Sequence, residues 1–236
     1  MKFEVGPSIV RDGLVLYLDA GNIASYTSGS NTWYDLIGVN NGTLTNGPTF
    51  DTGSNGSIVF DGSNDYVNQT LNTGSFTTEA TLIMFLKLTN ATPSDLFQTG
   101  IERLSAYLGH QASHYPWTDG TAYLSTFQTG GIRVDSISLS STIDRTNWHM
   151  ITITSSPGAN NWKFYQNLDL RRSATGSDTV VFSSDGVYNL GRSQSQLGGN
   201  LFYLNGNIAT IQLYNKALTE VEITQNYNAL KSRFSL

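Results

Sequence analysis

The chain contains no cysteine and has few charged residues. The absence of cysteine from the 236 residues excludes disulfide bonds and thiolate chemistry. Charged residues make up 13% of the sequence, against the roughly 25% that is usual in soluble domains. Glycine, serine, threonine and asparagine take their place, which is typical of a chain with many strands joined by many turns.

The sequence also lacks a surplus of basic residues and a long apolar run. Its 13 lysines and arginines stand against 18 acidic residues, which leaves a net charge of −5 at pH 7. Because no basic stripe is available to neutralise phosphates, this balance argues against nucleic acid as a partner. No run reaches the roughly 18 apolar residues of a membrane helix, and the N-terminus has no apolar core of a secretory signal. We therefore expect neither membrane insertion nor a signal peptide.

Apolar runs with the character of strands recur along the chain. Leu14–Asp19 is almost continuously apolar, which predicts a strand buried on both faces. Residues 76–88 are largely apolar in both alternating registers, which predicts a central strand. Residues 148–165 predict two strands joined as a hairpin. No linker separates these runs, so we predict one all-β domain over residues 13–236, preceded by an N-terminal docking segment at residues 1–12.

A long connection rich in glycine, asparagine, serine and threonine occupies residues 23–56. Trp33 and Leu36 interrupt it, and we expect them to pin it to the domain. A connection of this length in a compact domain is either packed by its own aromatic residues or functional.

One helix is predicted, at the C-terminal end. Thr219-Glu220-Val221-Glu222 is a capping box, in which the threonine hydroxyl and the second glutamate satisfy each other's free backbone amides. Four apolar residues then recur at helical spacing and form one face, namely Ile223, Tyr227, Leu230 and Phe234. Lys231 and Arg233 fall in the last turn, where the helix dipole favours cations. The helix is either a lid on the sheets or an interface, and we favour the lid.

Several separated stretches together resemble the laminin-G-like jelly rolls of the concanavalin-A-like lectin/glucanase superfamily. They stand in the order of that family, at residues 13–19, 40–44, 59–67, 148–153, 188–192 and 206–219. The resemblance implies an all-β, two-sheet antiparallel jelly-roll sandwich with one C-terminal helix, in which the first long strand lies near the last. The opening at Tyr17–Asp19 and the Asn-Gly-Thr-Leu stretch at residues 41–44 are similar to modules found in tailed-phage structural proteins.

The glutamates argue against catalysis. Glucanases of this superfamily carry Glu-x-Asp-x-x-Glu on one strand, which places two carboxylates on the same face as nucleophile and general acid. None of the glutamates of this chain stands in that motif, and they are Glu4, Glu79, Glu102, Glu220 and Glu222. We therefore expect no enzyme activity, and a glycoside hydrolase is the least favoured function.

Residues 109–117 combine histidine with aromatic residues and are predicted to form a loop. The structural interpretation is a surface loop folded under its aromatics. The functional interpretation is a recognition loop, because aromatic faces stack on sugar C–H surfaces while polar side chains donate hydrogen bonds. The candidate ligand-binding residues of this loop are His110, His114, Tyr115 and Trp117.

The cluster Asp61-Gly62-Ser63-Asn64-Asp65 lies between two apolar runs and predicts a strand, a tight corner and a second strand. Short polar side chains in such a corner bond to nearby backbone amides. Many relatives in the resembled superfamily bind Ca²⁺ through carboxylate and backbone oxygens. Asp61, Asn64 and Asp65 are therefore the candidate metal ligands, with Asp19 as a fourth if the first strand ends nearby. We favour the capping of turn amides over the metal.

The functional expectation is a non-enzymatic virion structural protein, assembled in the host cytoplasm. The roles considered are a capsid decoration and a fibre or tail adhesin with glycan binding by surface loops. Its expected partners are other virion proteins, with cell-surface glycans and a second copy of the chain as further candidates. The alternative is a carbohydrate-binding lectin module, secreted or associated with an enzyme.

Chelation decides between the two interpretations of Asp61 and Asp65. An ion that binds only the native state raises the melting midpoint, so its removal lowers that midpoint. The capping interpretation predicts the same midpoint in thermal melts with and without a chelator. A lower midpoint in the chelator would favour a calcium site.

Overall fold

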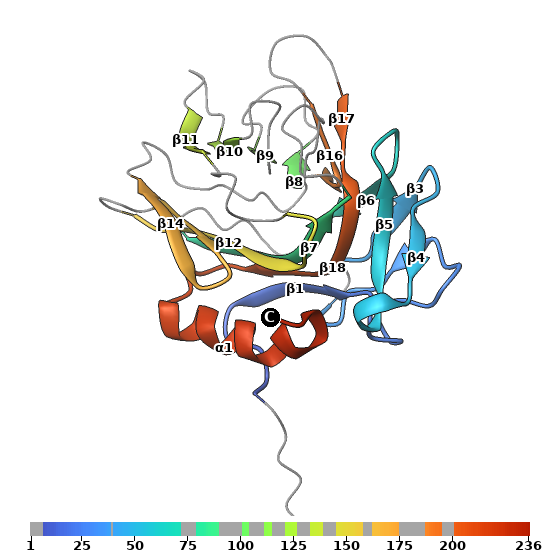
Figure 1. Cartoon of the computed structure of the whole chain (residues 1–236), viewed down its shortest axis with the longest axis horizontal. Helices are drawn as coiled ribbons and strands as arrows, with labels where there is room; N and C mark the ends of the chain where they lie inside the picture. The colour runs from blue at the N-terminus through green and yellow to red at the C-terminus, as the bar shows by residue number, and fades with distance from the viewer. Residues whose placement is uncertain are drawn as a thin grey trace, which may run out of the picture.

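The computed structural model describes residues 7–38, 40–71, 79–89, 101–103, 111–114, 121–126, 133–138, 145–157, 162–174, 187–194 and 201–236. For the strands between residues 101 and 138 only the backbone is described. The chain forms a mostly β structure of two antiparallel sheets with one C-terminal helix, which confirms the jelly-roll sandwich (Figure 1).

The larger sheet has eight strands in the order β14-β13-β12-β7-β18-β5-β4, with β1 also paired to β18. Their bounds are β1 (Leu14–Asp19), β4 (Thr49–Asp51), β5 (Ser57–Asp61), β7 (Ala80–Leu88), β12 (His149–Ser155), β13 (Trp162–Gln166), β14 (Asp169–Ala174) and β18 (Asn205–Tyr214). The predicted hairpin is confirmed, because β12 and β13 pair antiparallel.

The second sheet has five strands in the order β2-β3-β6-β15-β8. Their bounds are β2 (Thr32–Trp33), β3 (Gly42–Thr45), β6 (Tyr66–Thr70), β8 (Ile101–Arg103) and β15 (Val187–Leu190). Two smaller ladders complete the described strands. They are formed by β9 (Gln111–His114), β10 (Thr121–Thr126) and β11 (Arg133–Ser138), and by β16 (Arg192–Gln194) and β17 (Leu201–Tyr203).

Strand β18 joins the two ends of the chain at the centre of the larger sheet. One of its edges pairs with β7 along almost its whole length. Its other edge pairs first with β5 and then, from Thr210 to Tyr214, with β1. The expectation that the first long strand lies near the last is therefore confirmed.

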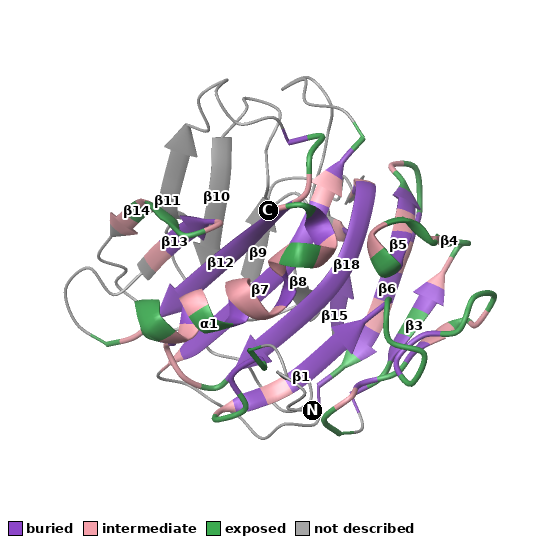
Figure 2. Cartoon of the chain, turned by 60° about the horizontal axis from the view of Figure 1, so that its bottom comes forward, coloured by how far each residue is buried: buried purple, intermediate pink, exposed green. Residues whose placement is uncertain are grey.

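The central strands of the larger sheet are buried on both faces, which explains their nearly continuous apolar runs. On β7, Leu82, Met84 and Leu86 belong to the core between the sheets. The alternating residues Ile83 and Phe85 belong to a second core on the opposite face. Figure 2 shows β7, β12 and β18 buried over most of their length. A strand inside two cores needs apolar residues in both registers.

Helix α1 (Glu220–Leu230) covers the second core and continues into the 3-10 helix η2 (Lys231–Phe234). Figure 2 shows it crossing the outer face of the larger sheet, and Ile223, Leu230 and Phe234 are buried there. The favoured interpretation of the helix as a lid is confirmed. Helix α1 has 11 residues. Among the described residues, no helix is both long enough and apolar enough to cross a membrane.

The predicted capping box is present at the start of α1. The Thr219 hydroxyl accepts a hydrogen bond from the Glu222 amide at 3.3 Å, and the Glu222 carboxylate accepts one from the Thr219 amide at 2.8 Å. Together these bonds satisfy two backbone donors that the first turn of a helix leaves without partners.

A buried asparagine ties the N-terminal segment to the helix. The Asn226 side chain accepts a hydrogen bond from the Val10 amide at 2.7 Å and donates one to the Tyr214 hydroxyl at 2.9 Å. Ile9 and Val10 lie in the second core of this chain, so this part of the expected docking segment packs on its own domain. Residues 1–6 of that segment lie outside the described residues.

Replacing Asn226 by alanine tests this tie. The substitution leaves the buried Val10 amide without a partner, and we expect it to lower the free energy of unfolding by about 1–3 kcal/mol. Asn228→Ala makes the same change on a half-buried position of the same helix, and its effect should stay within about 0.5 kcal/mol. Urea unfolding measures both variants. Equal stability of the two would contradict a structural role for Asn226.

Candidate functional site

The expected recognition loop is only partly described. His110, Tyr115 and Trp117 lie outside the described residues, and of His114 only the backbone is described. Residues 111–114 form strand β9, in which His114 pairs with Tyr123 of β10. The expectation of a loop is therefore wrong for these four residues, because they find an antiparallel partner that sequence alone does not reveal. The ligand-binding role stays a prediction.

The Asp61–Asp65 corner connects two strands of different sheets. β5 belongs to the larger sheet and β6 to the smaller one, so the corner crosses from one layer of the sandwich to the other. Asp61 Oδ1 accepts hydrogen bonds from the amides of Ser63 at 2.8 Å and Asn64 at 3.3 Å. Asp65 Oδ2 accepts one from the Asp61 amide at 3.1 Å. These bonds stabilise the tight turn that the crossing requires.

The two carboxylates of the corner have different environments. The Ser63 amide holds the pKa of Asp61 below its usual value, whereas burial raises the pKa of Asp65. Both groups cap backbone amides, as the favoured interpretation predicts. Among the residues that the structure describes, no three histidine or acidic side chains gather into a group that could hold a metal ion. Calcium binding at Asp61, Asn64 and Asp65 therefore stays a prediction without structural support.

Asp19, considered above as a further metal ligand, forms a buried ion pair. Its Oδ1 lies 2.8 Å from Nη1 of Arg233, which comes from the 3-10 helix η2. The same carboxylate accepts hydrogen bonds from the Gly21 amide at 2.9 Å and the Tyr17 hydroxyl at 3.0 Å. Arg233 was expected only to complement the helix dipole. Its main role in the structure is to neutralise Asp19.

Arg233 also holds the turn between β4 and β5, which contains the 3-10 turn η1 (Gly53–Asn55). Its Nε donates to the Ser54 carbonyl and its Nη2 to the Gly56 carbonyl, both at 3.3 Å. Three successive residues of this turn have positive φ angles, with 52° at Ser54, 60° at Asn55 and 113° at Gly56. Two of them are not glycine, so the turn is strained and depends on its surroundings.

A pocket of about 230 Å³ lies where this turn meets the connection after β1. It is lined by Ala20, Gly21, Ile23, Tyr26, Thr27, Ser28, Phe50 and Asn55. We call it the aromatic pocket, because the rings of Tyr26 and Phe50 lie 5.3 Å apart in its wall. The exposed residues Thr27, Ser28 and Asn55 add uncharged polar groups.

Two glycines allow the walls of the aromatic pocket to meet. A Cβ on Gly56 would lie 2.7 Å from the Ala20 carbonyl and 3.0 Å from Cζ of Phe50. A Cβ on Gly21 would collide with the Asn55 carbonyl and the Arg233 guanidinium. The two segments therefore touch through their backbones, and Arg233 lies directly behind this contact.

The aromatic pocket suits a small ligand that combines apolar faces with hydroxyl groups. Its volume is below the range of about 300–1,000 Å³ that is common for drug-sized ligands, so a single ring is the natural size of the bound unit. The sequence indicated that residues 23–56 were either packed by their own aromatics or functional. The structure supplies the aromatic packing, but Tyr26 and Phe50 themselves were missed as candidates.

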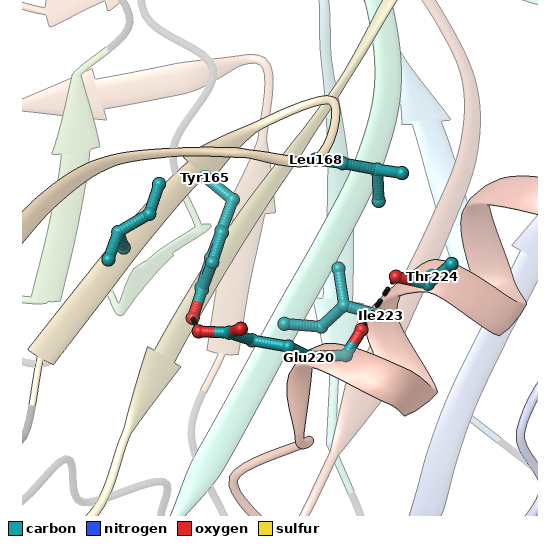
Figure 3. Close-up of a pocket in the computed structure, with 6 residues that line it drawn as sticks. Tyr165, Leu168, Glu220, Ile223 and Thr224 are labelled. Carbon is teal, nitrogen blue, oxygen red and sulfur yellow. Dashed lines mark hydrogen bonds between the residues drawn. The ribbon is translucent and has the colours of Figure 1, made fainter.

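A second, smaller pocket of about 140 Å³ lies between α1 and the hairpin of β13 and β14 (Figure 3). The Tyr165 hydroxyl donates to the Glu220 carboxylate at 3.3 Å, and the Thr224 hydroxyl donates to the Glu220 carbonyl at 2.7 Å. Burial, reinforced by the negative charge of Glu220, raises the pKa of Tyr165 to about 12. Because these polar groups already bond to one another, this pocket offers less to a ligand than the aromatic pocket.

A family model described as the concanavalin A-like lectin/glucanases superfamily matches residues 61–224. A search of curated proteins gave no match. Many solved structures match the chain.

Domain 4 of the extracellular arabinanase AbnA from Geobacillus stearothermophilus, solved with arabinotriose, is 17% identical with a TM-score of 0.65. The match covers 91% of this chain and 98% of that domain. The ligand-binding domain of botulinum neurotoxin serotype D, solved with N-acetylneuraminic acid, is 16% identical with a TM-score of 0.66. Here the match covers 92% of this chain and 50% of the neurotoxin domain.

The sialidase of Trypanosoma rangeli, solved with 2,3-difluorosialic acid as a covalent intermediate, is 12% identical with a TM-score of 0.63. The match covers 98% of this chain and 35% of the sialidase. The chain thus spans about half of the neurotoxin domain and about a third of the sialidase. At these identities the likeness shows a shared fold.

Arg233→Met tests the ion pair behind the aromatic pocket. The substitution leaves the buried Asp19 carboxylate uncompensated, and we expect a loss of about 3–5 kcal/mol in the free energy of unfolding. The double variant Asp19→Asn/Arg233→Met removes both charges and should recover part of this loss. Urea unfolding at pH 7 compares the three proteins. A single variant as stable as the original chain would show that the pair contributes nothing.

Proposed function

Because the chain belongs to the concanavalin A-like lectin/glucanases superfamily, we propose that it is a non-enzymatic carbohydrate-binding module. The observation that carries this proposal is the aromatic pocket, in which two rings stand beside the uncharged polar residues Thr27, Ser28 and Asn55. Two of the compared structures are domains solved with bound sugars, arabinotriose and N-acetylneuraminic acid.

The chemistry of the aromatic pocket matches the two surfaces of a sugar ring. The C–H groups of a sugar form an apolar face that packs on an aromatic ring, and Phe50 is the half-buried ring at the pocket. The sugar hydroxyls need donors and acceptors around their edge. A threonine or serine hydroxyl offers both, and the Asn55 amide offers two donors and an acceptor.

The aromatic pocket is also held in place before a ligand arrives. Arg233 bonds to the Ser54 and Gly56 carbonyls on one wall, and through Asp19 it reaches the amide of Gly21 on the other. Ordering a loop at the moment of binding costs affinity, so walls that are already fixed favour a weak, polar ligand such as a sugar.

The three glutamates whose side chains the structure describes have structural partners, which supports the proposed absence of catalysis. Glu222 belongs to the capping box, Glu220 accepts from the Tyr165 hydroxyl, and Glu79 accepts from the Ala217 amide at 3.2 Å. Hydrolysis by a pair of carboxylates requires two of them across one sugar bond, about 5–10 Å apart. No carboxylate lines the aromatic pocket.

The virion role expected from the sequence stays a prediction. Neither the family match nor the three compared structures supports it, and the same holds for the expected virion partners and for self-association. Copurification with capsids would test that role independently of sugar binding.

Phe50→Ala tests the proposed function. On a glycan array that includes arabinotriose, lactose and sialylated sugars, we expect the original chain to bind at least one sugar. Loss of the ring should weaken that binding by about tenfold, since removing roughly 60 Å² of apolar contact at about 25 cal/mol per Å² costs about 1.5 kcal/mol. Titration calorimetry measures the change in Kd.

Two further variants separate binding from folding. Tyr34→Ala removes an exposed aromatic residue outside the aromatic pocket and should leave Kd unchanged. Ser28→Trp fills the mouth of the pocket from an exposed position and should abolish binding without lowering the melting midpoint. Binding that survives Phe50→Ala and Ser28→Trp but is lost in Trp117→Ala would place the site in residues 109–117 instead.

A further inference from the structure

The aromatic pocket carries no charge on its walls. Its eight lining residues include no acidic or basic side chain. Tyr26 is the one lining residue with a titratable side chain, and burial raises its pKa, so its phenol stays neutral at pH 7. The compared domains were solved with sugars of both kinds, neutral arabinotriose and anionic N-acetylneuraminic acid. Domains of this fold are therefore found with neutral and with anionic sugars, and the pocket itself must determine which class is bound.

We propose that the aromatic pocket takes an uncharged sugar unit and discriminates against sugars that bear a carboxylate. This inference rests on the proposed function, because it concerns the ligand of the same pocket. It goes beyond that function by selecting between two chemical classes of sugar.

Arg233 is a cation next to the pocket, and it is already paired with Asp19. Its guanidinium lies against Gly21 in the pocket wall, where a Cβ would collide with it. All three of its nitrogens already donate, to the Asp19 carboxylate and to the carbonyls of Ser54 and Gly56. Only 13% of its side chain is exposed, against 9% of the Asp19 side chain.

The ion pair makes the region behind the pocket electrically neutral. Arg233 does not line the pocket, and Asp19 already neutralises its charge, so a ligand carboxylate would gain little attraction from it. That carboxylate would lose water and gain only neutral donors from the pocket walls. Burying a charge without an opposite charge costs far more than burying a hydroxyl that finds hydrogen-bond partners.

The overall charge acts in the same direction. The chain has a net charge of −5 at pH 7, which repels an anionic sugar at long range. A neutral sugar meets no such repulsion, and its hydroxyls find partners in Thr27, Ser28 and Asn55.

The test measures Kd by titration calorimetry for arabinotriose, lactose and 3′-sialyllactose, on the original chain and on Phe50→Ala. We expect a neutral sugar to bind in a manner that depends on Phe50, and 3′-sialyllactose to bind about tenfold more weakly or worse. Binding of 3′-sialyllactose that equals or exceeds that of the neutral sugars, and that is lost in Phe50→Ala, would overturn this inference and leave the proposed function standing. Binding of no sugar, in these titrations and on the array, would overturn the proposed function itself.

A gain of function provides the second test. Ser28→Lys places a cation at the exposed mouth of the pocket, and Ser28→Gln places a neutral side chain of similar reach there. We expect the lysine variant to bind 3′-sialyllactose more tightly than the glutamine variant by severalfold, with an advantage that shrinks in high salt. Equal binding by the two variants would show that charge at the pocket does not select the ligand.

Discussion

The buried ion pair between Asp19 and Arg233 holds together parts of the chain that are far apart in sequence. Asp19 ends the first strand of the larger sheet, and Arg233 lies in η2, the 3-10 helix that follows α1. The same arginine bonds to the strained turn between β4 and β5. A buried carboxylate is tolerated only when an opposite charge compensates it. The positions of η2, the first strand and this turn therefore depend on one another.

The ion pair lies behind the wall of the aromatic pocket, where Arg233 packs against Gly21. The central strands of the larger sheet pack on one face against the core between the sheets and on the other against the core under α1. The aromatic pocket opens instead beside the edge strand β4, where the connection after β1 meets the turn before β5. Arg233 fixes the shape of this pocket through its bonds to the turn, and Asp19 neutralises the charge of Arg233.

The candidate site could be predicted only in outline. The composition of residues 23–56 marked the segment that lines most of the aromatic pocket, because a long connection in a compact domain needs its own aromatics or a function. Tyr26 and Phe50 could not be chosen from it, since their rings meet only after β4 joins β5 and the connection after β1 folds back. Asp61 and Asp65 are close in sequence and were candidate metal ligands, yet Asp61 Oδ1 and Asp65 Oδ2 accept hydrogen bonds from turn amides.

Sequence alone determined the features that depend on local chemistry or on burial pattern. The capping box of α1, the doubly apolar strands β1 and β7, and the tight corner at Asp61–Asp65 follow from side-chain type and spacing. Only the tertiary structure decided which sheet each strand joins, that the corner crosses between layers, and that Asp19 meets Arg233. These contacts link residues up to 214 positions apart, and no local pattern records such a pairing. A function that resides in the aromatic pocket is therefore a property of the fold.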